Sequence, residues 1–82
     1  MTRTDFSGRE LVKALTGYGF RITGRTGSHV QLRYNHPDNP DDVRRTTIPL
    51  HDSIAIGTLR GIADDCGAKD FYAWCDWIER AL

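Results

Sequence analysis

Two short runs of alternating apolar and polar residues, separated by a glycine turn, most constrain what this chain can fold into. Residues 20–25 and 29–35 both alternate with a period of two, which is typical of strands that bury one face. The segment between them contains Thr26-Gly27-Ser28, whose residue types favour a tight turn. The pattern therefore predicts a β-hairpin. Its apolar positions are Phe20, Ile22, Val30, Leu32 and Tyr34.

A helical segment precedes this hairpin. Ser7 and Glu10 have the spacing of a capping box, in which each side chain accepts the backbone N–H of the other residue. Phe6 and Leu11 stand where a hydrophobic staple places its two apolar residues. The apolar spacing that follows predicts a helix over residues 8–18, and two glycines end it.

The rest of the chain predicts one more strand and two more helices. Residues 44–48 form the third strand, which Pro49 ends, after an exposed loop of turn-forming residues at 35–42. Apolar spacing of three and four residues then predicts a helix closed by Gly67 and a last helix that begins at Asp70. Three strands with one apolar face need a helical cover. We therefore expect an α+β fold of order α-β-β-β-α with an extra C-terminal helix, in which helices pack on one face of a three-stranded antiparallel sheet.

The length and the cysteines limit the class of protein. The 82 residues suffice for one small domain, 1–82. No apolar stretch approaches the roughly 20 residues of a membrane span, and residues 1–5 lack the apolar segment of a secretory signal, so we expect a cytoplasmic protein that does not bind a membrane. Cys66 and Cys75 lie outside any Cys-x-x-Cys pattern on apolar helix faces, and we interpret them as buried free thiols.

The chain has no net charge, but its charges are unevenly distributed. Residues 1–36 contain six Lys or Arg against two acidic residues, whereas the remaining 46 residues contain five against nine. This asymmetry allows one basic face on a neutral molecule. Guanidinium and hydroxyl groups on such a face bind phosphates and ribose hydroxyls. The polar face of the predicted sheet would carry Arg21, Thr23, Arg25, Gln31 and Arg33, with Arg45 or Thr47 beside them.

Four motifs follow one another over residues 7–68. They are Ser7-Gly8-Arg9-Glu10-Leu11-Val12-Lys13-Ala14-Leu15, then Arg25-Thr26-Gly27-Ser28-His29 after Gly19-Phe20, then Thr47-Ile48-Pro49-Leu50-His51, and finally Ile56-Gly57-Thr58-Leu59-Arg60-Gly61-Ile62. In this order they resemble the signatures of HicA-type toxins, which are small mRNA interferases of toxin–antitoxin systems. The fold of that family is similar to a double-stranded-RNA-binding domain, in agreement with the α-β-β-β-α order that the residue pattern predicts.

The resemblance implies a function and a partner. It implies a toxin of a type II toxin–antitoxin system that cleaves mRNA as an endoribonuclease without metal or cofactor, with a single His as general acid or base. The active residue of the family is the His of a Gly-Ser-His motif, which corresponds to His29. The implied partners are RNA and a HicB-type antitoxin that covers this face.

The expected side-chain direction of His29 agrees with such a role. Val30, Leu32 and Tyr34 share the apolar face of their strand, so His29 falls on the polar face beside Arg33. Metal-free RNA cleavage needs a base for the ribose 2′-hydroxyl, an acid for the leaving 5′-oxygen and positive charge near the phosphorane. An imidazole titrates near neutrality, so it can serve as the base or as the acid.

Six further residues are candidates for binding RNA. Arginines would hold phosphates, and Gly27 lets the RNA backbone approach closely because it has no Cβ. Ser28 either orients His29, contacts a phosphate or serves the turn alone. His51 leaves three interpretations open: a second acid or base, a phosphate contact, or an imidazole that fixes the loop before the next helix. The candidates are Arg21, Arg25, Gly27, Ser28, Arg33 and His51.

The sequence indicates no metal site. His29, His36 and His51 have no i, i+3 or i+4 spacing between them and no neighbouring cysteine. We interpret His36, which lies in the turn-rich loop, as a solvated residue. Two other classes of function stay open: a non-catalytic RNA-binding module of similar fold, and a protein-binding adaptor that uses the polar sheet face as its interface.

Overall fold

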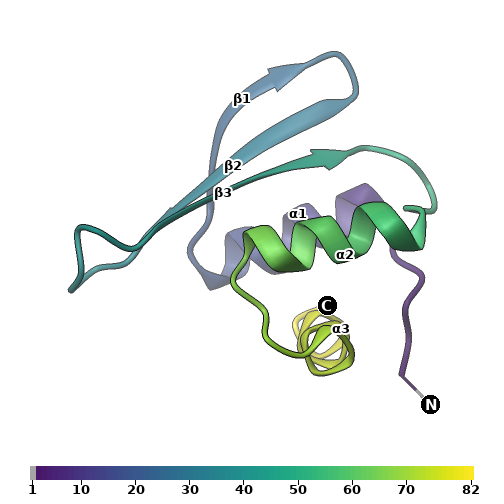
Figure 1. Cartoon of the computed structure of the whole chain (residues 1–82). Coiled ribbons are helices and arrows are strands. Elements are labelled where there is room, and N and C mark those ends of the chain that lie inside the picture. Colours follow the sequence, from purple (N-terminus) through teal and green to yellow (C-terminus); the bar gives the residue numbers. More distant parts are fainter. Residues whose placement is uncertain (1) are drawn as a thin grey trace.

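Three strands form one antiparallel sheet in the order β1-β2-β3, and the helices lie on one side of it (Figure 1). The computed structural model describes residues 2–82. It confirms the predicted α+β fold, with the order α-β-β-β-α and an added C-terminal helix. The elements are α1 (Gly8–Tyr18), β1 (Arg21–Thr26), β2 (His29–Asn35), β3 (Val43–Pro49), α2 (Ile56–Asp65) and α3 (Phe71–Arg80).

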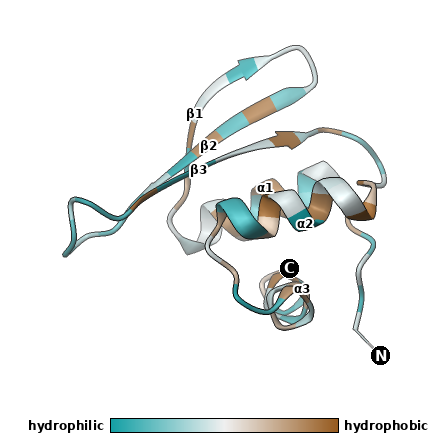
Figure 2. Cartoon of the chain, viewed as in Figure 1, coloured by the Kyte–Doolittle hydropathy of each residue, from teal (hydrophilic) through white to brown (hydrophobic). Residues whose placement is uncertain are grey.

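The helices form two layers under the sheet. Both α1 and α2 contact β3, whereas α3 contacts α1 and α2. In Figure 1, α1 and α2 accordingly lie between the sheet and α3. Figure 2 shows the loop between β2 and β3 as mostly hydrophilic, in agreement with the exposed loop expected there. Within residues 2–82, no helix is long and apolar enough to cross a membrane.

The start of α1 has the predicted capping box. The Glu10 N–H donates to Ser7 Oγ at 3.1 Å, and the Ser7 N–H donates to Glu10 Oε1 at 3.0 Å. Arg3 Nη2 donates to both carboxylate oxygens of Glu10 at 2.8 Å. The Ser7 N–H, and after it the Arg3 guanidinium, lower the pKa of Glu10. Phe6 and Leu11 are both buried, so polar and apolar contacts together fix where α1 begins.

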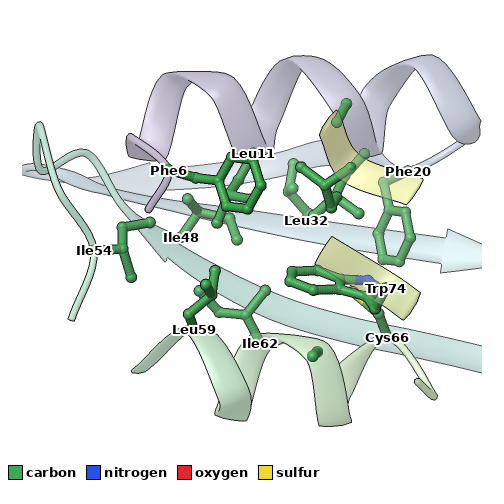
Figure 3. Packing of buried hydrophobic residues seen from close by; sticks show 14 of the residues in the cluster. Phe6, Leu11, Phe20, Leu32, Ile48, Ile54, Leu59, Ile62, Cys66 and Trp74 are labelled. Carbon is green, nitrogen blue, oxygen red and sulfur yellow. The ribbon is translucent and has the colours of Figure 1, made fainter. Parts of the chain in front are cut away.

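The hydrophobic core fills the space between the sheet and the three helices. Figure 3 shows Leu11 of α1 and Leu59 of α2 converging with Leu32 and Ile48 of the strands, and Trp74 of α3 beside them. The most deeply buried large side chains are Phe6, Leu11, Leu15, Leu32, Ile48, Leu59, Cys75 and Ile78. Both cysteines are buried free thiols, as predicted. Burial raises the pKa of the Cys66 thiol to about 12.

An irregularity in β1 changes the direction of its later side chains. The pairing with β2 shifts by one residue between Ile22 and Gly24, which marks a β-bulge at Thr23. Beyond the bulge, Arg25 pairs with the core residue Val30, and directly paired residues share a face of the sheet. The prediction that Arg25 lies on the polar face is therefore wrong. Ile22, expected in the core, is 57% exposed, because α1 and α2 pack beneath β3 rather than beneath β1.

The loop after β2 is organised by His36, which is not the solvated residue that was predicted. Its Nδ1 accepts the backbone N–H groups of Asp38 at 3.0 Å and Asn39 at 3.1 Å. The half-buried ring also lies edge-on to Tyr34, with centroids 6.4 Å apart. His36 thus holds the turn at the opposite end of β2 from His29.

Candidate functional site

A two-residue turn delivers His29 to the first position of β2. Thr26 pairs with His29, so Gly27 and Ser28 form the whole turn. Gly27 has a φ of 59° and Ser28 does not have a positive φ, which is the pattern of a type II′ hairpin turn. A Cβ added at Gly27 would meet no atom within 4 Å, so the turn, rather than packing, requires this glycine. His29 is exposed and the next residue, Val30, is buried, as strand parity predicts.

The fold brings His51 to His29. The end of β3 lies opposite the start of β2, and the Leu50 N–H donates to the Ser28 carbonyl at 2.6 Å. The chain then reaches α1, where the Gly8 N–H donates to the His51 carbonyl at 2.9 Å. The two imidazole rings lie edge-on to each other, with centroids 6.5 Å apart and planes at 70°. Both side chains are exposed, so the pair is open to a ligand.

Gly8 allows α1 to approach the segment that carries His51. A Cβ at this position would overlap the carbonyl oxygen of Pro49 and would lie 2.8 Å from Leu50 Cα. A larger residue would therefore separate α1 from this segment. Figure 1 shows the start of α1, the turn between β1 and β2, and the end of β3 at the same end of the molecule.

A polar groove extends from the face that carries His29. Arg33 pairs with Arg45 on one side and with Arg21 on the other, so three guanidinium groups cross the sheet in one row. Gln31 and Thr47 form the adjacent row toward the turn. The groove has a volume of about 650 Å³ and receives hydroxyl, amide and guanidinium groups from all three strands and from α2. Its lining consists of Thr23, Gln31, Leu32, Arg33, Arg45, Thr46, Thr47, Thr58, Gly61, Ile62 and Asp65.

The structure therefore divides the predicted arginines between two faces. Arg21 and Arg33 lie on the face of His29. Arg25 lies on the other face, and its Nε donates to the Gly27 carbonyl at 3.0 Å. The sequence pattern predicts Arg45 or Thr47 on the polar face, and both lie there because they are two residues apart in β3.

These groups suit acid–base chemistry on a phosphodiester. Exposed imidazoles take up and release protons near neutral pH, and guanidinium groups donate to phosphate oxygens. Hydroxyl groups of threonine side chains add contacts to phosphate or ribose. Among residues 2–82, no group of three or more His, Cys, Asp or Glu side chains is placed to hold a metal ion.

The chain matches a model of a known protein family. The family model described as HicA toxin of bacterial toxin-antitoxin matches residues 8–68. The matched segment runs from the start of α1 to the loop after α2, so it contains both histidines and the groove and leaves α3 outside. The comparisons with curated proteins and with solved structures gave no match.

Proposed function

The chain belongs to the HicA toxin family, and we propose that it is an mRNA endoribonuclease in which His29 acts as a general acid or base. As a family member it is a toxin of a toxin–antitoxin system. The proposal is carried by the exposed His29 imidazole, which stands on the polar sheet face two residues along β2 from Gln31, a residue of the groove lined by arginine and threonine side chains and by Asp65. The proposed activity needs no cofactor.

The reaction that fits these residues is an internal transesterification of RNA. A base removes the proton of a ribose 2′-hydroxyl, and the 2′-oxygen attacks the adjacent phosphorus. The bond from phosphorus to the 5′-oxygen breaks, and an acid protonates that oxygen, which leaves a 2′,3′-cyclic phosphate and a 5′-hydroxyl. His29 would supply one of the proton transfers, each typically worth about 10²–10⁴-fold in rate. Guanidinium groups would stabilise the charge on the phosphorane.

The groove fits a single strand of RNA. Successive residues on one face of a strand are about 7 Å apart, which is comparable to the distance between neighbouring phosphates of an extended nucleic acid. With the reacting phosphate at His29, the next phosphates along β2 would lie near Gln31 and then near the row formed by Arg33 and Arg45. Contacts of this kind position the backbone without reading its sequence.

The same face would serve regulation. We propose that a HicB-type antitoxin covers the two histidines and the groove, and that its acidic side chains pair with the arginine row. Such a complex would exclude RNA because both ligands need the same guanidinium groups. The substrate is mRNA, so the proposed site of action is the cytoplasm.

Substitution of His29 tests this function. Induced expression of the wild-type chain should arrest growth, and His29→Ala should relieve the arrest because a proton-transfer group is lost. Circular dichroism should stay unchanged because the side chain is exposed. In vitro, the wild-type chain should cleave a synthetic transcript in the presence of EDTA, and His29→Ala should be slower by about 10²-fold or more.

The other outcomes distinguish the competing classes of function. Continued growth arrest by a folded His29→Ala protein would exclude His29 as the acid or base. If the wild-type chain retains RNA without forming cleavage products, it is a non-catalytic RNA-binding module. If it binds no RNA even at low salt, where phosphate contacts are strongest, the polar face serves a protein partner alone.

A further inference from the structure

We infer that His51 is the second proton-transfer group of this reaction and acts opposite His29. The inference rests on the proposed function, because the two imidazoles transfer protons only if the protein cleaves RNA. A mechanism with one imidazole leaves one of the two proton transfers to solvent. The structure offers a second exposed imidazole whose ring centroid is 6.5 Å from that of His29.

The separation of the two rings suits a phosphate between them. Their centroids are 6.5 Å apart and their planes meet at 70°. The rings are too far apart to hydrogen-bond each other. A proton-transfer contact spans about 3 Å, so both imidazoles can reach a phosphodiester placed between them. In an in-line displacement the attacking and leaving oxygens are on opposite sides of phosphorus, so the reaction uses two separate proton-transfer groups.

Backbone contacts on two sides hold the segments of the two histidines together. The Leu50 N–H holds the Ser28 carbonyl at 2.6 Å, next to His29, and the Gly8 N–H holds the His51 carbonyl at 2.9 Å. One contact joins the segment after β3 to the hairpin turn, and the other joins it to α1. Both histidines are therefore positioned by main-chain atoms, which leaves their side chains free for chemistry.

The rings have no competing structural task. In the part of the chain that the structure describes, no hydrogen bond engages the ring of His29 or of His51, whereas His36 Nδ1 accepts two. Three charged residues are near the pair in sequence or strand register, of which Arg25 lies on the other face of the sheet. Asp52 follows His51, Arg9 follows Gly8 in α1, and Arg25 precedes the residue opposite His29. A ring that makes no hydrogen bond within the protein is free to contact a substrate.

The resulting step is balanced without a co-reactant. One imidazole, neutral at the start, takes the 2′-hydroxyl proton while the new bond from the 2′-oxygen to phosphorus forms. The other, protonated at the start, gives its proton to the 5′-oxygen as the old bond breaks. The pair ends with the proton on the opposite ring, and exchange with water restores it.

The pH dependence of cleavage tests the inference. Full-length wild-type, His29→Ala and His51→Ala proteins are assayed with EDTA on one short single-stranded RNA over the pH range of imidazole titration. The wild type should give a bell-shaped rate profile, which reports one acid and one base. His51→Ala should lower the rate by about 10²–10⁴-fold and lose one limb of the bell. Added imidazole should restore part of its rate, which a merely structural role would not allow.

His36 supplies a matched control. It lies about 23 Å along β2 from His29, and His36→Asn keeps a hydrogen-bond acceptor in the turn, so its profile should equal that of the wild type. If His51→Ala does not fold, His51→Gln, which keeps polarity but transfers no proton, is interpreted in the same way. A His51 variant that cleaves at the wild-type rate and keeps both limbs of the bell-shaped profile overturns the inference. An inactive His29→Ala protein would in that case still support the proposed function. A wild-type chain that cleaves no RNA overturns both.

Discussion

At the scale of single residues, one glycine allows α1 to pack against the segment that carries His51. The first turn of α1 touches the Pro49 carbonyl at Gly8, and the Gly8 N–H holds the segment that carries His51. Gly17 lies in the same helix, but a Cβ added there would meet no atom within 4 Å. Packing therefore requires glycine at position 8, whereas glycine at position 17 has only the general cost of glycine in a helix.

We predict that Gly8→Ala destabilises the protein and slows RNA cleavage, whereas Gly17→Ala does neither. Overpacking typically costs about 1–3 kcal/mol. Replacement of an unconstrained helical glycine by alanine instead adds about 0.5–1 kcal/mol of stability. Urea unfolding followed by circular dichroism measures the change in unfolding free energy of each variant, and the cleavage assay measures its rate. A Gly8→Ala protein as stable as the wild type would show that this contact does not hold α1 to the histidine segment.

Local sequence was enough to orient His29 but not to pair it with His51. The side-chain direction of His29 follows from its immediate neighbours, because alternation along one strand determines which side chains share a face. The contact with His51 depends on the register of β2 against β3 and on the approach of α1 at Gly8, which join residues far apart in the sequence. The role of His36 was missed for a related reason: its hydrogen bonds depend on how the turn after β2 closes.

At the scale of elements, the accuracy of the prediction depends on whether a segment contains the capping residues that begin and end it. α1 has the predicted bounds because its capping box and the glycine at its C-terminal end are local to the segment. α3 begins after Asp70, whose side chain accepts two backbone N–H groups. β1 has no such signal for its bulge. An alternating pattern assumes one partner for every residue, so the extra residue Thr23 reversed the predicted direction of Arg25 but not that of Arg21.

The two faces of the sheet lead to different predictions for two arginines. In a His29→Ala background that cannot cleave, Arg45→Ala should weaken binding of single-stranded RNA. It should also lower the slope of log affinity against log salt by about 0.7, the value for one phosphate contact. Arg25→Ala should leave the slope unchanged, because this side chain lies on the other face. Titrations at several salt concentrations measure both slopes, and equal losses would contradict the groove as the RNA path.

At the scale of the whole molecule, α3 completes the core without touching the polar face. It lies outside the matched family segment, yet Cys75 and Ile78 are fully buried. Trp77 also packs edge-on against Tyr18 of α1, with ring centroids 5.2 Å apart. A domain of this size buries little apolar surface for its length, so an added helix contributes stability. Because α1 and α2 separate α3 from the sheet (Figure 1), α3 should affect the histidine pair and the groove only through its contribution to core packing.

This separation predicts that weakening α3 lowers stability and leaves catalysis intact. Ile78→Val removes one buried methyl group at a cost of about 1 kcal/mol, which should lower the Tm by about 4–8 °C in a domain of this size. The exposed Asp76 on the same helix is the control, and Asp76→Asn should change stability by less than about 0.5 kcal/mol. Thermal unfolding measures both variants, and cleavage well below the Tm should proceed at the wild-type rate. If Ile78→Val instead abolished cleavage while the protein was still folded, α3 would have to act on the histidine pair directly.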